Sequence, residues 1–270
     1  MSAPVQFATL PTGPTVAYTD SGGHGPALLL SHGFLLDHTM FDAQVEAFGD
    51  TWRVIAWDER GHGETTGGPD RYTYWDTAAD ALALLDHLGV ETAVLGGMSQ
   101  GGFLSLRAAL IAPSRVRALI LIDTQAGTEN PEVAPLYEAM HDQWVTDGAG
   151  DDLARSALSI VMSDDPELLD IWAARTRARP KEALTAPFRC LMDRDAITDR
   201  LGEITAPVLV IHGTADGAIP IERAEELVEL LPAAHPLVAV EGGAHASNMT
   251  HPREVNAAMA AFLGALAAPR

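Results

Sequence analysis

The sequence predicts an α/β fold built on a mostly parallel sheet, and three observations support this prediction. Short runs rich in Val, Ile and Leu alternate with longer amphipathic stretches, as strands alternate with helices in such folds. The short runs are apolar almost throughout rather than at every second position, which is typical of strands buried on both faces. Several of them end at glycine or aspartate, where a turn is expected to follow.

Six apolar runs are expected to form the strands of this sheet. They cover residues 27–33, 52–58, 92–99, 117–123, 206–213 and 235–242. The helices expected between and after them cover residues 73–89, 103–112, 221–231 and 253–266. Near the N-terminus, VQFATL and TVAYTD flank the turn sequence PTGP, which predicts an antiparallel hairpin at one edge of the sheet.

The alternation stops between about residues 127 and 202. This segment contains no strand-like run, and its sequence is helix-prone throughout. We interpret it as a helical insertion over the sheet rather than as a separate domain. The expected organisation is therefore a first part of the core over residues 1–126, a helical cap over 127–202 and a second part of the core over 203–270.

Composition and charge narrow the possible partners. The 270-residue chain is 47% hydrophobic and 20% charged, which is typical of a globular protein. Its net charge of −20 argues against nucleic acid and anionic membranes as partners. No apolar run reaches the roughly 18 residues of a membrane span, and no leader-like segment is found at the N-terminus. The single cysteine, Cys190, excludes an internal disulfide, and a cytoplasmic location is expected.

The stretch GGMSQGG, residues 96–102, places one serine between two pairs of glycines. Gly97, Ser99 and Gly101 match the pattern G-x-S-x-G, and they lie where a predicted strand gives way to a predicted helix. In that context the pattern indicates a nucleophile elbow, a sharp turn that exposes the serine hydroxyl. Flanking side chains would clash in such a turn, so glycine is required there. An ordinary glycine-rich turn is the alternative, and the flanking strand and helix favour the elbow.

A serine hydroxyl needs a base to activate it, and the base needs an acid to orient it. Among ten histidines, His245 is the candidate base because it lies in the loop between the last predicted strand and the last predicted helix. Asp216 is the candidate acid because it follows the strand over 206–213. Asp123 ends another predicted strand and is the second candidate. We expect Asp123 to brace the carboxyl edge of the sheet instead.

The order Ser99, Asp216, His245 is the order of the α/β-hydrolases, and the chain resembles their small, capped esterase, lactonase and haloperoxidase-like members. The resemblance extends over nearly the whole chain. It rests on the stretches SHGFLLDHTMF (31–41), WDERGHGET (57–65), GGMSQGG (96–102), HGTADGAIP (212–220) and GGAHASNMTHP (242–252).

The resemblance implies an oxyanion hole formed by the backbone N–H groups of Phe34 and Gln100. Removing one donor of this kind costs about 3 kcal/mol of transition-state stabilisation in a well-studied hydrolase. Many relatives carry SMGG where this chain has SQGG. We expect the Gln100 side chain to point back under the turn, with little effect on mechanism. A serine at the elbow argues against the relatives that use aspartate there, namely haloalkane dehalogenases and epoxide hydrolases.

Some apolar residues of the expected cap should line a substrate pocket, and Trp144, Met162 and Trp172 are candidates. Simple packing of the cap onto the sheet is the alternative for each of them. The sequence contains no H-E-x-x-H motif, no paired cysteines, no P-loop and no G-x-G-x-x-G motif that opens a helix. We therefore expect neither a metal nor a cofactor.

These observations predict a serine hydrolase that cleaves carboxylic esters through an acyl-enzyme intermediate. Two alternatives use the same residues, an enol-lactonase-like lactonase and a cofactor-free perhydrolase or haloperoxidase. A ligand-binding protein that kept the fold without catalysis is a third alternative, which an intact triad disfavours. The expected partner is a small ester or lactone, and the oligomeric state is left open.

Overall fold

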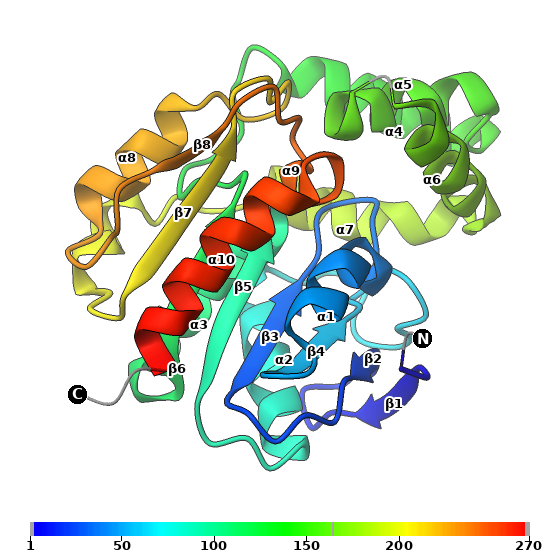
Figure 1. The fold of residues 1–270 in the computed structure, drawn as a ribbon. Helices are drawn as coiled ribbons and strands as arrows, with labels where there is room; N and C mark the ends of the chain where they lie inside the picture. Colours follow the sequence, from blue (N-terminus) through cyan, green and yellow to red (C-terminus); the bar gives the residue numbers. More distant parts are fainter. Residues whose placement is uncertain (1–2, 164, 268–270) are drawn as a thin grey trace.

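An eight-stranded sheet forms the centre of the computed structural model, which describes residues 3–163 and 165–267 (Figure 1). The strands are β1 (Gln6–Thr9), β2 (Thr15–Asp20), β3 (Ala27–Ser31), β4 (Arg53–Trp57), β5 (Ala93–Met98), β6 (Val116–Ile122), β7 (Val208–Gly213) and β8 (Val238–Val240). Their order across the sheet is β1-β2-β4-β3-β5-β6-β7-β8. Strands β3 to β8 are parallel, whereas β1 and β2 form an antiparallel hairpin at one edge. The predicted fold class and the predicted hairpin are confirmed.

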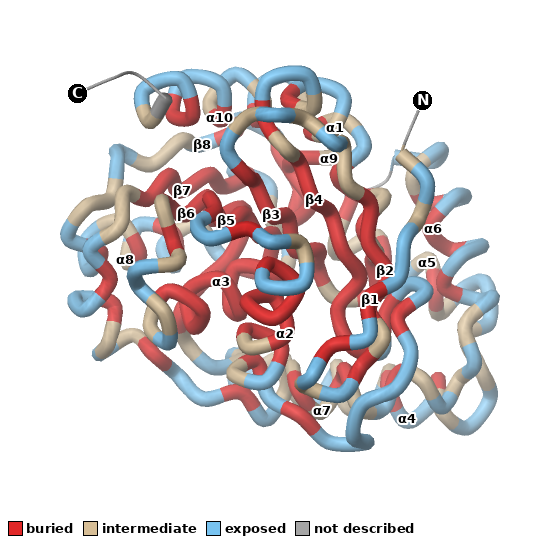
Figure 2. Tube along the Cα trace, turned by 90° about the horizontal axis from the view of Figure 1, so that it is seen from below, coloured by how far each residue is buried: buried red, intermediate tan, exposed pale blue. Residues whose placement is uncertain are grey.

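Helices cover both faces of this sheet. They are α1 (Asp42–Phe48), α2 (Tyr74–His87), α3 (Gln100–Ile111), α8 (Glu222–Leu230), α9 (Ser247–Thr250) and α10 (Pro252–Ala267). Viewed along the sheet, α1 and α10 lie on one side of the strands, and α2, α3 and α8 lie on the other (Figure 2). Leu29 of β3 packs into the hydrophobic cluster on the α2–α3 face, and its neighbours Leu28 and Leu30 pack into the cluster on the opposite face. Burial on both faces explains the continuous apolar sequence of the strands.

Local sequence signals mark both ends of helix α2. Thr73 begins α2 through a capping box, because its hydroxyl accepts from the backbone N–H of Asp76 and the Asp76 carboxylate accepts from the N–H of Thr73. Gly89 follows the end of this helix with a φ of +66°, a conformation that glycine adopts without strain. The observed helix therefore closely matches the expectation for residues 73–89.

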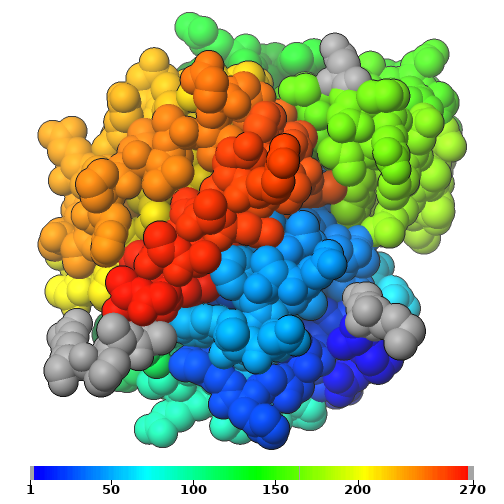
Figure 3. Space-filling model, in the orientation of Figure 1, coloured from blue at the N-terminus to red at the C-terminus, as the bar shows by residue number. Residues whose placement is uncertain are grey.

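Four further helices occupy the segment between β6 and β7. They are α4 (Ala134–Asp147), α5 (Asp151–Met162), α6 (Pro166–Ala178) and α7 (Thr185–Met192). Helices α4, α5 and α6 lie together beyond one end of the sheet (Figure 1), and their residues form a continuous block of the surface (Figure 3). Asp164, inside the expected cap segment, lies outside the described residues. The division into core and cap stays a prediction.

The elements expected from the sequence differ from the structure at strand β8 and at two short helices, α1 and α9, which were not predicted. Strand β8 has only three residues, because it is an edge strand that pairs with β7 from Val238 onward. The expected strand over 235–242 was therefore too long. Helix α1 was not predicted, since its seven residues are too few to show a clear helical period. Within the part of the chain that the structure describes, no helix has the length and apolar character needed to cross a bilayer.

Candidate active site

Ser99 occupies the turn between β5 and α3 in a strained backbone conformation, with φ +51° and ψ −115°. Positive φ is rare for residues other than glycine and usually persists only where surrounding contacts hold it. Here the backbone N–H of Ser99 donates to the carbonyl of Ile122 at 2.9 Å. The Ser99 carbonyl accepts from the Thr124 hydroxyl at 2.7 Å. These bonds tie the turn to the neighbouring strand β6 and the residues that follow it.

The flanking glycines of this turn have no room for a side chain. A Cβ atom on Gly97 would lie 2.1 Å from the backbone carbonyl carbon of Gly101. A Cβ atom on Gly101 would lie 2.0 Å from the carbonyl oxygen of Ser31 in β3. Both neighbours are backbone atoms, which cannot move aside as a flexible side chain can. The steric reason for the G-x-S-x-G pattern is therefore present in this chain.

The structure brings the three predicted triad residues together. The Oγ atom of Ser99 lies 3.0 Å from Nε2 of His245. The Nδ1 atom of the same ring lies 2.8 Å from Oδ2 of Asp216. Because a carboxylate accepts, Nδ1 carries the proton and Nε2 is free to accept from the serine hydroxyl. This chain of hydrogen bonds is the arrangement that a serine nucleophile requires.

Backbone groups and a second histidine hold Asp216 in place. Its Oδ1 accepts from the N–H groups of Ala218 and Ile219 at 2.8 and 2.9 Å. Nε2 of His212 lies 3.2 Å from Oδ2. Burial by itself raises the pKa of Asp216, but the charge of His245 and the hydrogen bonds from both histidines outweigh burial and lower the pKa overall. Asp216 is therefore ionised at neutral pH.

Asp123, the second candidate for the acid, does not contact His245 through a hydrogen bond. Its two carboxylate oxygens accept from the backbone N–H groups of Gly213 and Ser247, at 2.8 and 2.9 Å. Gly213 ends β7 and Ser247 begins α9, so Asp123 links the two segments that carry the acid and the histidine. It braces the edge of the sheet, as its position in the sequence indicated.

Replacing Asp123 by asparagine should change how stability depends on pH. Complete burial raises the pKa of Asp123 to about 6 from 3.8, although the charges of His212 and His245 lower it in part. The folded state therefore holds this proton more tightly than the unfolded chain does. The resulting stabilisation is complete below about pH 4 and disappears as the pH rises to about 6.

We expect the free energy of unfolding of the wild type, relative to Asp123→Asn, to fall by about 2 kcal/mol between pH 4 and pH 7. Urea unfolding of both proteins at each pH measures this difference. A difference that stays constant with pH, or that grows as the pH rises, would contradict the assignment.

The two proposed oxyanion donors border the same site. Phe34 lies in the loop after β3, and Gln100 is the first residue of α3. Neither backbone N–H donates a hydrogen bond to any residue that the structure describes. The first N–H groups of a helix lack partners within the helix, so the N–H of Gln100 is available to a ligand. Phe34, Ser99 and His245 line one cavity together, which places the candidate donors around the nucleophile.

Sequence reasoning missed Glu59, which holds the Gln100 side chain. Nε2 of Gln100 donates to Oε2 of Glu59 at 3.0 Å, and the Tyr74 hydroxyl donates to Oε1 of Gln100 at 3.3 Å. The backbone N–H of Glu59 also donates to Nε2 of His32, at 2.9 Å. Burial, together with the charges of nearby aspartates, raises the pKa of Glu59 well above its usual value. Glu59 and Gln100 are 41 positions apart, so no local pattern connects them.

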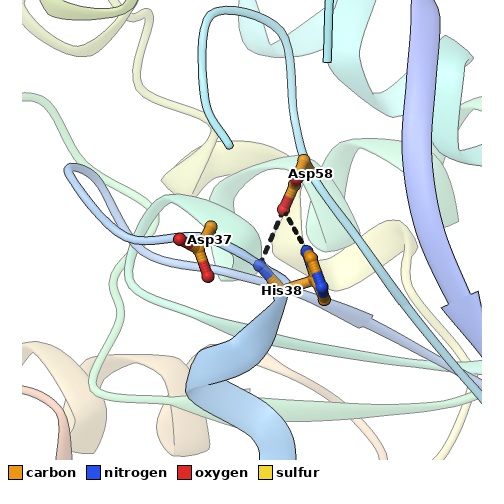
Figure 4. A group of neighbouring side chains, drawn as sticks. All are labelled: Asp37, His38 and Asp58. Carbon is orange, nitrogen blue, oxygen red and sulfur yellow. Dashed lines mark hydrogen bonds and ion pairs between the residues drawn. The ribbon is translucent and has the colours of Figure 1, made fainter. Parts of the chain in front are cut away.

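A second cluster braces the loop that follows β3. The backbone N–H and the ring Nδ1 of His38 both lie within hydrogen-bonding distance of Oδ1 of Asp58, at 2.7 and 2.8 Å (Figure 4). The other oxygen of Asp58 accepts from the N–H of Glu64 at 2.8 Å. Asp37 accepts from the N–H of Thr39 at 3.0 Å. These bonds fix the segment that begins with the proposed oxyanion donor Phe34.

A cavity that is partly open to solvent extends from Ser99 and His245 between the sheet and helices α4, α5 and α7. Its lining is mostly apolar, as is usual for small-molecule sites. It is formed by Phe34, Leu35, Met98, Ser99, Phe103, Glu129, Tyr137, Met140, His141, Trp144, Ala157, Ile160, Val161, Leu184, Phe188, Leu191, Arg194, Ala218, Ile219 and His245.

Of the three pocket residues predicted from the sequence, only Trp144 lines this cavity. Met162 and Trp172 are not among the residues that line it, and both are buried in the hydrophobic cluster between the inserted helices and the sheet. In α5, the preceding residues Ile160 and Val161 face the cavity instead of Met162. Packing, the alternative considered for each residue, accounts for Met162 and Trp172.

Comparison with known proteins shows which family this chain belongs to. The family model of the alpha/beta hydrolase fold matches residues 26–252. The 3-oxoadipate enol-lactonase 2 of Acinetobacter baylyi is 27% identical over 88% of this chain and 88% of its own length. A Mycobacterium tuberculosis protein named as a candidate non-heme bromoperoxidase is 28% identical over 94% of this chain and 99% of its own length.

This chain is also similar to a protein whose structure has been solved. The structure of a thermophilic esterase from Thermogutta terrifontis is 29% identical, with a TM-score of 0.88 over 98% of this chain and 100% of that one. The sheet order, the turn at Ser99 and these similarities agree. The chain belongs to the α/β-hydrolase family, as a member of the esterase, lactonase and haloperoxidase-like type.

Proposed function

We propose that this protein is a serine carboxylesterase in which Ser99 is the nucleophile, His245 the general base and Asp216 the orienting acid. One observation carries the proposal: the hydrogen-bonded chain from Ser99 through His245 to Asp216 opens into the apolar cavity. An ester placed in that cavity can present its carbonyl carbon to the serine Oγ. Small esters or lactones are the proposed substrates.

The proposed reaction has two stages. Oγ of Ser99 attacks the ester carbonyl while Nε2 of His245 takes the hydroxyl proton, and ionised Asp216 stabilises the imidazolium that forms. The N–H groups of Phe34 and Gln100 donate to the developing oxyanion. His245 then gives the proton to the leaving alcohol, and the acyl group stays on Ser99. In the second stage His245 activates a water molecule, which releases the acid and restores the serine.

We also propose that residues 127–202 act as a cap over the substrate. The inserted helices supply Met140, Ile160 and Phe188 to the cavity, so they form a large part of its wall opposite the sheet. A wall of this kind determines the size of the acyl or alkoxy group that fits.

Lactone hydrolysis is the second candidate function, and the similarity to the Acinetobacter baylyi enol-lactonase favours it. A lactone is a cyclic ester, so the same nucleophile, base and oxyanion donors would serve. The two functions differ in whether the leaving alcohol remains attached to the acyl group.

Hydrolysis of p-nitrophenyl esters from acetate to decanoate, with γ-butyrolactone and δ-valerolactone alongside, tests the proposal. We expect the linear esters to be hydrolysed, with kcat/KM passing through a maximum at one chain length because the cavity is closed by apolar walls on several sides. Hydrolysis of lactones alone would support the second candidate. A folded protein that hydrolyses neither class would contradict both.

A further inference from the structure

The proposed oxyanion donor Phe34 lies in a tight turn whose backbone is strained. The N–H of Leu36 donates to the carbonyl of Gly33 at 3.1 Å. Phe34 and Leu35 are therefore the two central residues of a β-turn. Leu35 has a φ of +67°, a conformation that such turns normally reserve for glycine or asparagine. A bulky residue keeps this conformation only where surrounding contacts hold it, so the direction of the Phe34 N–H depends on those contacts.

His32 holds the start of this turn from the core. Its Nε2 accepts from the backbone N–H of Glu59, so Nδ1 carries the proton and donates to the carbonyl of Gly33 at 2.8 Å. Burial lowers the pKa of His32 to about 4, which keeps the ring neutral near pH 7. The Gly33 carbonyl and the Phe34 N–H belong to one planar peptide group. This bond therefore orients the donor from one side of the turn.

Two arginines of the inserted helices hold the other end of the turn. Nη2 of Arg179, the residue that follows α6, donates to the carbonyl of Leu36 at 3.0 Å. Nη1 of Arg175, within α6, lies 3.2 Å from a carboxylate oxygen of Asp37 (Figure 4) and also donates to the Thr39 hydroxyl. Both contacts fall on residues 33–39, which we call the donor loop. Helix α6 is thus joined directly to the segment that carries Phe34.

These two contacts differ from those of the neighbouring cations. Residues 171–194 contain six basic side chains. Four of them make hydrogen bonds or ion pairs to described residues within the segment 127–194: Arg177 with Asp151, Lys181 with Thr146, Arg189 with Glu138, and Arg194 with Gly127, Glu129 and Leu191. Arg175 and Arg179 instead reach the donor loop of the core. A charged donor binds a carbonyl more strongly than a neutral one, and Arg179 is half-buried, which limits competition from water.

We propose that Arg179, supported by Arg175, is a positioning residue for the oxyanion hole. It fixes the end of the strained turn, so that the Phe34 N–H points toward the position of the oxyanion. The inserted helices then contribute to catalysis as well as to the walls of the cavity, because the donor is aligned while α6 contacts the donor loop. This assignment rests on the proposed function for its catalytic meaning. The anchoring of the loop can be measured without turnover.

The kinetic test uses Arg179→Met, which removes the donors and keeps a long apolar side chain. We expect kcat for p-nitrophenyl esters to fall about tenfold or more while KM changes less than about twofold, because an oxyanion donor acts mainly on the transition state. Arg179→Lys keeps a charged donor and should recover a large part of kcat. Arg175→Met should show the same pattern with a smaller effect, since Arg175 is more exposed.

Arg177→Met is the matched control. Arg177 lies in the same helix as Arg175, but its ion pair is with Asp151 of α5 rather than with the donor loop. The control should keep the wild-type kcat and KM. A fall in kcat that Arg177→Met shares would assign the effect to general loosening of the inserted helices and overturn the proposal.

Hydrogen exchange measured by NMR tests the anchoring without a substrate. The Leu36 N–H, which closes the turn, should exchange about tenfold or more faster in Arg179→Met than in the wild type or in Arg177→Met, because the turn opens more often. Unchanged exchange at Leu36 would overturn the proposal, since packing of the buried Leu35 and Leu36 side chains would then hold the loop alone.

The two measurements separate this inference from the proposed function. Wild-type hydrolysis of esters, with kcat unchanged in Arg179→Met and in Arg175→Met, would leave the esterase proposal intact and overturn the positioning role. A wild type that hydrolyses no ester, with faster exchange at Leu36 in Arg179→Met, would contradict the esterase proposal and support the anchoring of the donor loop.

Discussion

Replacing Ser99 by alanine is expected to lower kcat for every hydrolysed ester by about 10⁴-fold or more. The variant removes the oxygen atom that is the proposed nucleophile. Among the residues that the structure describes, no other nucleophile lies next to Nε2 of His245. Residual activity would come from binding and from the oxyanion donors alone. Steady-state kinetics of the wild type and of Ser99→Ala, with the best p-nitrophenyl ester, measures the decrease in kcat.

The same substitution should leave the fold intact. The Ser99 hydroxyl makes a hydrogen bond to His245, whereas the backbone bonds of the turn do not involve the side chain. The melting temperature should therefore change by only a few degrees. Ser156→Ala, at an exposed position in α5, is the control and should keep wild-type kinetics. A Ser99→Ala protein with more than a tenth of the wild-type kcat would rule out Ser99 as the nucleophile.

Replacing Gly101 by alanine is expected to destabilise the protein by about 3 kcal/mol or more, or to prevent folding. The added Cβ would lie 2.0 Å from the carbonyl oxygen of Ser31, so either α3 must move away from β3 or the turn must open. Each change displaces Ser99 from His245. We therefore expect any folded Gly101→Ala protein to lose most of its activity as well.

The matched control is Gly264→Ala. Gly264 lies at an exposed position inside α10, and nothing lies within 4 Å of a Cβ atom built there. Alanine favours a helix over glycine, so this variant should be more stable by about 0.5–1 kcal/mol. Urea unfolding of both variants measures the contrast. A Gly101→Ala protein as stable and active as the wild type would show that the tight turn is not required.

Most of the core could be predicted because its signals are local. Strands β3 to β7 are buried on both faces, and their apolar runs stand out from the amphipathic sequences around them. Strand β8 was overestimated because its apolar run is longer than the part that pairs with β7. Helix α1 gave no clear signal because it is only two turns long.

The three candidate triad residues could be predicted because each lies in a short motif at the end of a strand. The turn at Ser99 and the loops of Asp216 and His245 each follow a strand, and parallel strands bring their carboxyl ends to one edge. The lining of the cavity was not predictable in the same way, because the orientation of each inserted helix is set by tertiary packing. Met162 and Trp172 therefore could not be distinguished from Trp144 by sequence alone.

Labelling with a fluorophosphonate, followed by peptide mapping by mass spectrometry, tests whether Ser99 is the nucleophile. The reagent bonds covalently to an activated serine and mimics the tetrahedral intermediate. We expect one adduct per chain, on Ser99, formed in parallel with the loss of esterase activity and absent from Ser99→Ala. An adduct on a different residue, or full activity after Ser99 has been labelled, would contradict it.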